Sequence, residues 1–262
     1  MVLVPATKTR VLAVANQKGG VAKTTTVASL GAALAELGQR VLLVDLDPQA
    51  CLTFSLGIDP EDLELSVHHV LTKGLDVSEV ILETDDGVDL LPATIELARA
   101  EADLLTRTGR EHVLRTMVED LAEQGEDYDW ILLDCPPSLG VLTVAALTAA
   151  TGVLIPLQCE TLSHRGVGQL LDTVHDVKRF TNRELEVWGV LPTLYDGRTN
   201  HARAVLETIS ETYDLAVIEP PIPKSIRFAE APAAGRSILK TSRTNKGAQA
   251  YRDVAAGLLK RG

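Results

Sequence analysis

The stretch VLAVANQKGGVAKTTTVASLGAALAEL, residues 11–37, decides the fold of this chain. Its apolar run Val11–Ala15 predicts a buried strand, and the helical pattern over Thr24–Leu37 stops at Gly38. Glycines between a strand and a helix let backbone N–H groups point at a phosphate, to which the helix N-terminus adds a positive dipole. We therefore expect a phosphate-binding loop over Lys18–Thr25.

Two lysines and a threonine in this loop suit a nucleoside triphosphate. Lys23 is placed to reach the terminal phosphates, and the hydroxyl of Thr24 is placed to ligate Mg²⁺. An ordinary loop of this kind needs one lysine, so Lys18 suggests that the extra charge serves another phosphate. The predicted nucleotide-binding residues of the loop are Lys18, Gly19, Gly20, Val21, Ala22, Lys23, Thr24 and Thr25.

Short aliphatic runs alternate with helical patterns along the rest of the chain. The runs are continuous, which is typical of parallel strands covered on both faces. We predict an α/β fold: a doubly wound, mostly parallel sheet flanked by helices. The later strands are expected at Val41–Val44, Val88–Leu91, Ile131–Leu133, Val153–Leu157 and Val187–Leu191. The later helices are expected at Ile95–Thr106, Glu111–Glu123, Leu142–Ala150, Gly166–Phe180 and Asn200–Tyr213, with short helices over a sheet edge within Ile58–Thr84.

Three acidic residues follow expected strands, where an open α/β sheet binds its ligands. Asp45 and Asp47 come directly after the second strand, and Asp134 closes the run Trp130–Leu133. Of the first two, we expect one to hold the Mg²⁺ shell while the other orients the attacking water. Asp134 is expected to bind Mg²⁺ through water, as the acid at the end of an apolar strand does in phosphate-transferring sites.

Composition limits the class of protein. The chain of 262 residues suits a single α/β domain over 1–262, with a flexible N-terminus at 1–9 and an aliphatic core. No apolar run approaches the ~20 residues that span a bilayer. The three cysteines are far apart, which argues against a zinc ribbon or an iron–sulfur ATPase and favours a reducing cytoplasm. The six histidines show no metal-binding spacing, and we expect surface or packing roles for His68, His69 and His112.

Charge is distributed unevenly along the chain. The overall net charge is −11, yet the segment 224–262 holds nine basic and two acidic residues and has a net charge of +7. Such asymmetry indicates either a face that binds a polyanion or a solvated basic helix at the C-terminus.

Four stretches give the sequence a resemblance to a known family. They are ANQKGGVAKTTT at 15–26, VDLDPQ at 44–49, LLDCPPS at 132–138 and IRFAEAPAAGRSI at 226–238. The first contains KGGxxK[ST], the deviant Walker A signature of the ParA/MinD group of P-loop ATPases. Together, in this order and over nearly the whole chain, they resemble the ParA/Soj branch. Ala22 stands where most relatives carry glycine, and its methyl group slightly limits how the loop bends around phosphate.

The resemblance assigns roles to particular residues. It implies that Lys18 crosses a dimer interface to the partner's ATP, that Asp47 positions the attacking water, and that Asp45 lies nearer Mg²⁺ and the loop. Pro223 resembles the segment that packs over adenine. The implied catalytic residues are Lys18, Lys23 and Asp47, and the implied metal ligands are Thr24, Asp47 and Asp134. The implied contacts to DNA are Arg198, Lys224, Arg227, Arg236 and Lys240.

The resemblance also implies a function. It is that of a cytoplasmic ATP hydrolase, slow and stimulated by a ParB-like partner, which uses ATP and Mg²⁺, forms a homodimer with ATP and binds DNA without sequence preference. We expect it to position or segregate DNA or another cargo, associated with the nucleoid in the ATP state. The alternatives are a MinD-like membrane-associated ATPase, an orphan ParA-like positioning factor, a small-molecule or metal-transfer ATPase, and a non-enzymatic scaffold. The short C-terminal end has few large apolar residues, so we expect no stable membrane association.

Overall fold

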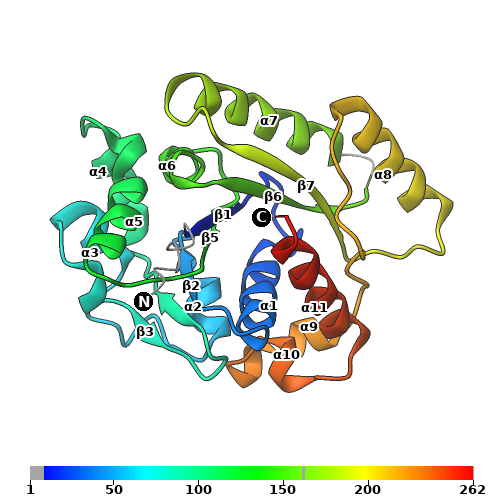
Figure 1. Ribbon diagram of the computed structural model, residues 1–262, viewed down its shortest axis with the longest axis horizontal. Coiled ribbons are helices and arrows are strands. Elements are labelled where there is room, and N and C mark those ends of the chain that lie inside the picture. Colours follow the sequence, from blue (N-terminus) through cyan, green and yellow to red (C-terminus); the bar gives the residue numbers. More distant parts are fainter. Residues whose placement is uncertain (1–8, 161–162, 262) are drawn as a thin grey trace, which may run out of the picture.

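The computed structural model describes residues 9–160 and 163–261, which build one sheet with helices on both faces (Figure 1). Within these residues the sheet has seven strands in the order β3-β4-β2-β5-β1-β6-β7. The strands are β1 (Arg10–Val14), β2 (Val41–Asp45), β3 (Leu82–Glu83), β4 (Asp89–Leu91), β5 (Trp130–Asp134), β6 (Gly152–Gln158) and β7 (Glu186–Thr193). The expected flexible N-terminus, 1–9, lies almost wholly outside the described residues.

Helices connect the strands and cover both faces of the sheet (Figure 1). Those in the described residues are α1 (Lys23–Glu36), α2 (Cys51–Ser55), α3 (Val67–Lys73), α4 (Leu97–Leu104), α5 (Val113–Glu123), α6 (Val141–Ala149), α7 (Ser163–Phe180), α8 (Asn200–Tyr213), α9 (Arg227–Glu230), α10 (Ile238–Thr241) and α11 (Lys246–Leu259). Short 3₁₀ turns η1 (Val77–Glu79), η2 (Arg110–His112) and η3 (Pro232–Ala234) lie between them.

The continuous apolar runs are explained by burial on both sides. Along β1, Val11 and Ala13 face the core under α3 to α8, while Leu12 and Val14 face the core under α1, α2, α10 and α11. A strand with two covered faces needs no polar alternation. The predicted doubly wound α/β fold is therefore confirmed, and the parallel pairings set the ends of β1, β2 and β5 side by side.

The main differences from the predictions lie at β3 and in the C-terminal segment, and the short helices α2, α9 and α10 were not predicted either. β3 pairs antiparallel with β4, through Leu82 opposite Leu90, and a two-residue strand is too short to show a period in the sequence. The basic C-terminal segment is not a simply solvated helix, because α11 buries Tyr251, Val254 and Leu258 in the core beneath α1. Its basic residues lie on the outer side of a helix that also stabilises the fold.

Candidate active site

The loop between β1 and α1 has the backbone form that a bound phosphate requires. Gly20 has a φ of 74° and Ala22 a φ of 64°, so both lie in the left-handed region. The carbonyl of Ala22 accepts the first helical hydrogen bond, from Thr26 N–H at 2.9 Å. From β7, the hydroxyl of Thr193 donates to the carbonyl of Val21 at 2.9 Å and fixes the loop against the sheet.

The methyl group of Ala22 has a larger effect than the sequence suggests. We expected it to limit slightly how the loop bends. In the structure the backbone of Ala22 is left-handed, a conformation that costs an L-residue roughly 1–2 kcal/mol. Glycine adopts the same conformation without this steric cost. The loop keeps this strained form at the position where most ParA/MinD relatives are expected to have glycine.

Lys23 is buried at the start of α1, with 8% of its surface exposed. Its Nζ donates to the carbonyl of Lys18 at 3.3 Å, a weak contact for an ammonium group. Burial lowers the pKa of Lys23, and the nearby carboxylate of Asp134 opposes that shift. Within the described part of the chain, the ammonium group of Lys23 has no charged acceptor at hydrogen-bond distance. A phosphate oxygen would supply one.

Asp45 and Asp134 lie opposite each other at the ends of the neighbouring strands β2 and β5. Both are almost completely buried. Burial raises the pKa of Asp45 to about 6 and, together with the charge of Asp45, raises the pKa of Asp134 well above its usual value. Among the described residues, no donor lies in hydrogen-bonding geometry with either carboxylate oxygen of Asp134, although the hydroxyl of Thr24 is close enough to lower its pKa.

These orphan acceptors fit a hard divalent cation. Mg²⁺ takes oxygen ligands and keeps several waters, and a buried carboxylate with free lone pairs matches that preference. The hydroxyl of Thr24 and the ammonium of Lys23 lie near enough to Asp134 to lower its pKa against the effect of burial. The residues that would hold the ion with a nucleotide are Thr24 and Asp134, with Asp45 next to them.

Asp47 stands two residues beyond the end of β2 and is half-buried. Its N–H donates to Asp45 Oδ1 at 3.1 Å, and its own Oδ1 accepts from Gln49 N–H at 2.9 Å. The turn therefore presents Asp47 beside the loop while Asp45 is held inward. This position agrees with a water-positioning role, and that role stays a prediction, as does direct ligation of Mg²⁺ by Asp47.

Sequence reasoning missed Thr53, which fixes Asp45. Its N–H and its hydroxyl both donate to Asp45 Oδ2, at 2.9 and 2.8 Å. The same hydroxyl accepts from Ala93 N–H at 3.0 Å, which joins α2 to the segment after β4. No local pattern marks a threonine eight residues after an acid, so only the fold reveals this contact.

A second missed residue, Asn16, sets the entrance of the loop. Its Nδ2 donates to the carbonyl of Pro156 at 2.8 Å, and its Oδ1 accepts from Lys18 N–H at 3.0 Å. The side chain of Lys18 pairs with Glu160, with 2.5 Å between Nζ and Oε2. One third of the Lys18 side chain is exposed, and its role toward the nucleotide of its own or of a second subunit stays a prediction.

The predicted DNA-binding cations lie on the surface beyond β7 and around α9 and α10. Three of them have carboxylate partners within the chain: Arg198 with Asp196, Arg227 with Glu230, and Arg236 with Asp85. Lys224 is exposed and Lys240 is half-buried. Pro223 is half-buried and bridges Tyr195 by its backbone, just beyond the end of β7.

Comparisons with known proteins give the site its family. The profile of the AAA domain family matches residues 9–187. Soj, the sporulation initiation inhibitor protein of Bacillus subtilis, is 43% identical to this chain over 94% of its length and 96% of Soj. The chain belongs to the ParA/Soj family of P-loop ATPases. A further relative is the chromosome partitioning protein ParA of Myxococcus xanthus. It is 38% identical to this chain over 98% of this chain and 90% of the Myxococcus protein.

A solved structure shares more sequence and carries a different name. It is a protein of Mycobacterium smegmatis described as cobyrinic acid a,c-diamide synthase with bound ADP and magnesium. It is 56% identical to this chain, with a TM-score of 0.85, and the match covers 97% of this chain and 95% of the Mycobacterium protein. The ligands of that protein, a nucleotide and Mg²⁺, are those that the loop and the orphan carboxylate fit.

The described residues include no helix that is both long enough and apolar enough to cross a membrane.

Proposed function

We propose that this ParA/Soj protein is a slow ATPase that dimerises with ATP and Mg²⁺, binds DNA without sequence preference and segregates or positions a DNA cargo. A ParB-like partner would stimulate hydrolysis. The observation that carries the proposal is the arrangement of the two lysines. Lys23 is buried beside the acid pair of β2 and β5, whereas Lys18 is partly exposed and paired with Glu160.

Hydrolysis would use the groups at the strand ends. Lys23 would contact the terminal phosphates, and Asp47 would orient the water that attacks them. Asp45, fixed by Thr53, keeps the turn that carries Asp47 in place. Mg²⁺, held by Thr24 and Asp134, would neutralise charge on the phosphates when bound. Pro223 would cover the base.

Lys18 would act on the nucleotide of a second subunit. Its side chain is partly exposed and paired with Glu160, so a partner's phosphate would be accessible to it once it leaves Glu160. A cation supplied across an interface stabilises charge that develops on the transferred phosphoryl group. It also makes ATP part of the interface, so nucleotide binding drives dimerisation by mass action.

The proposed DNA surface consists of Arg198, Lys224, Arg227, Arg236 and Lys240. Binding without sequence preference requires contacts to phosphates and no reading of bases. The three carboxylate partners within the chain do not prevent this, because exposed ion pairs are weak and screened by water and salt. Phosphate can replace them, and a dimer doubles the number of cations available. In cells the dimer would lie on the nucleoid within the cytoplasm.

The test of the dimer is a mass measurement on Lys18→Ala. We expect ATP with Mg²⁺ to double the light-scattering mass of the wild type, whereas ADP leaves it unchanged. Lys18→Ala should stay monomeric with ATP yet still bind it, since Lys23 and the loop are intact. The control is Lys178→Ala, an exposed lysine on α7, which should dimerise normally. Equal masses with ATP and ADP in the wild type would contradict the proposal.

One comparison favours a second function, ATP-dependent synthesis of a diamide. If the amide nitrogen came from glutamine, a reactive thiolate would be the expected nucleophile. Burial raises the pKa of Cys159 to about 11 and that of Cys135 further, and it also raises the pKa of Cys51. None of the three cysteines is therefore activated, and the partitioning function is favoured. Amidation of cobyrinic acid by the purified protein, with ammonia or glutamine as donor, would reverse this choice.

The MinD-like alternative requires a helix that is free to enter a lipid surface. The apolar side of α11 is instead buried, with Tyr251, Val254 and Leu258 in the core beneath α1. This helix could reach lipid only by leaving the fold, which argues against membrane binding through it.

A further inference from the structure

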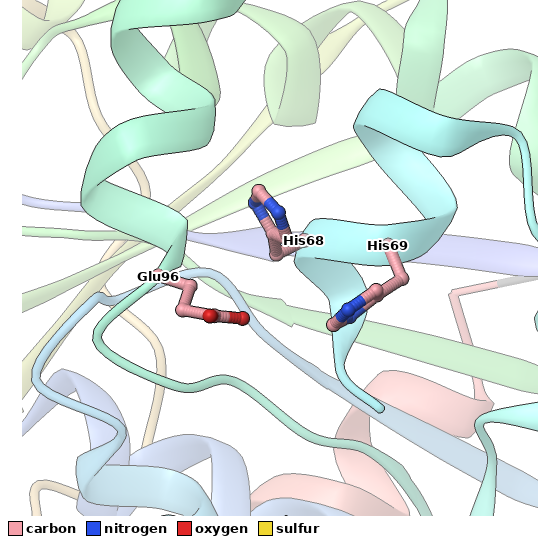
Figure 2. Close-up of side chains that lie close together, drawn as sticks. All are labelled: His68, His69 and Glu96. Carbon is pink, nitrogen blue, oxygen red and sulfur yellow. The ribbon is translucent and has the colours of Figure 1, made fainter. Parts of the chain in front are cut away.

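Two histidines and a glutamate converge on the face of the sheet away from α1 and α11. His68 and His69 lie in the first turn of α3, and Glu96 comes directly before α4. Figure 2 shows the carboxylate of Glu96 extending toward the start of α3, from which the two imidazole rings project. One ligand atom from each of the three side chains lies within 4.8 Å of the other two. Small adjustments of these side chains would therefore let a single ion contact all three.

The backbones that carry these side chains are already held together. Val67 N–H donates to the carbonyl of Pro92 at 2.8 Å, and the hydroxyls of Ser66 and Thr94 are hydrogen-bonded at 3.3 Å. These contacts tie the start of α3 to the segment that leads into Glu96. A site on two segments that are fixed in this way loses little freedom when an ion binds.

His68 provides an unused ligand nitrogen. Only 7% of its surface is exposed, and its buried Nδ1 has no hydrogen-bond partner within residues 9–160 and 163–261. Buried polar atoms nearly always have a partner, so this nitrogen calls for an explanation.

His69 already has one role, which limits the affinity. Its Nδ1 accepts from Ser66 N–H at 3.2 Å and so helps to cap α3. A neutral ring with an acceptor at Nδ1 carries its proton on Nε2. An ion could therefore bind this ring only if the hydrogen bond that caps α3 is given up. The loss of that bond reduces the affinity for the ion by up to about tenfold.

We propose that His68, His69 and Glu96 form a binding site for a divalent transition metal, with Zn²⁺ as the best match. Two imidazole nitrogens and one carboxylate oxygen are typical Zn²⁺ ligands, and a water would complete a tetrahedron. Mg²⁺ and Ca²⁺ prefer all-oxygen sites, so the nitrogens select against the ion of the nucleotide site. The bound ion would link α3 to α4 and would be separate from ATP hydrolysis.

The test is a calorimetric titration of Zn²⁺ into the full chain, with Mg²⁺ in excess to occupy the acid pair at β2 and β5. We expect one Zn²⁺ per chain. His69→Gln removes the imidazole yet keeps an acceptor that can cap α3, since glutamine suits this position of a helix. Glu96→Gln alters an exposed residue with little effect on folding. Each should weaken binding by roughly tenfold or more, because even indirect partners of a metal contribute that much.

The control is His175→Gln, an exposed histidine on α7, which should bind as the wild type does. Co²⁺ gives a second readout, since a four-coordinate site should show intense visible absorption that both ligand variants lose. Cys51 is an exposed thiol and a competing ligand, so the titration is repeated on Cys51→Ser. The proposal is overturned if the wild type takes up no Zn²⁺, if His69→Gln and Glu96→Gln bind it unchanged, or if Cys51→Ser abolishes binding.

Discussion

Replacing Ala22 by glycine tests how the phosphate-binding loop is held. Ala22 has φ 64° and ψ 35°, a left-handed conformation that costs an alanine roughly 1–2 kcal/mol. Ala22→Gly removes that cost, while the added freedom of the unfolded chain offsets about 0.4–1 kcal/mol of the gain. We therefore expect the variant to be more stable by roughly 0.5–1 kcal/mol.

The assay is urea and thermal unfolding of the protein without nucleotide, because a bound nucleotide would add its own stabilisation. For a chain of this size, the expected gain corresponds to a rise in Tm of about 1–4 °C. The matched control is Ala204→Gly, at an exposed interior position of α8. There the same chemical change should reduce the free energy of unfolding by about 1 kcal/mol.

Opposite signs for the two variants would show that the loop stores strain at Ala22. A loss of stability in Ala22→Gly equal to that in Ala204→Gly would refute the argument, because the left-handed backbone would then carry no cost that glycine relieves. The urea m-value must stay constant across the three proteins for the comparison to hold.

Three further predictions concern the acids and the DNA surface. Asp47→Ala should lower ATP turnover by roughly a hundredfold or more while leaving ATP affinity nearly intact, and normal turnover would transfer the role to Asp45. The pKa of Asp45 is about 6 in the folded protein, above its usual 3.8, so between these pH values the folded state binds this proton more tightly than the unfolded state. The stability of the wild type therefore falls as pH rises from about 4 to above 6. The measurement is urea unfolding with EDTA, of the wild type and of Asp45→Asn. The free energy of unfolding of the variant minus that of the wild type should therefore increase by roughly 2 kcal/mol from pH 4.5 to pH 7. A difference that does not change with pH would contradict the assigned pKa. Arg227→Glu and Arg198→Glu should each remove most of the ATP-dependent binding to two unrelated duplexes in interferometry, with Lys178→Glu as the control, and binding that survives both reversals would place the DNA on another face.

The fold could be predicted because its signals are local. The apolar run of β1, the helical pattern of α1 and the glycines between them lie within 27 consecutive residues, and the same alternation recurs along the chain. The pattern over Asn200–Tyr213 predicted both ends of α8. In the structure Thr199 caps the start of this helix by accepting a hydrogen bond from Ala202 N–H. Asp45 and Asp134 could be placed at the same edge of the sheet, because parallel strands end there, whereas their position on adjacent strands comes from the structure.

The contacts that complete the site could not be predicted, because they join residues far apart in sequence. Glu160 lies 142 residues from Lys18, and Thr193 lies 172 residues from the carbonyl of Val21 that it holds. The left-handed form of Ala22 is a further case, since alanine favours a helix and gives no sign of φ > 0. The polyanion-binding reading of the basic segment stays a prediction, because charge along the sequence does not reveal which cations already have partners.

Those partners supply a common physical basis for the proposed nucleotide and DNA steps. Four of the predicted functional cations pair with a carboxylate of the same chain: Lys18 with Glu160, Arg198 with Asp196, Arg227 with Glu230, and Arg236 with Asp85. Each pair is exposed to water to some degree and therefore weak, and a phosphate that offers a charge-assisted contact can displace the carboxylate. Without nucleotide these pairs neutralise the cations of a chain whose net charge is −11, which weakens its attraction to DNA. Dimerisation would place two such sets of cations along one duplex. The free energy of exchange would then add over several phosphates, so the proposed DNA binding would depend on nucleotide state without a large change of fold.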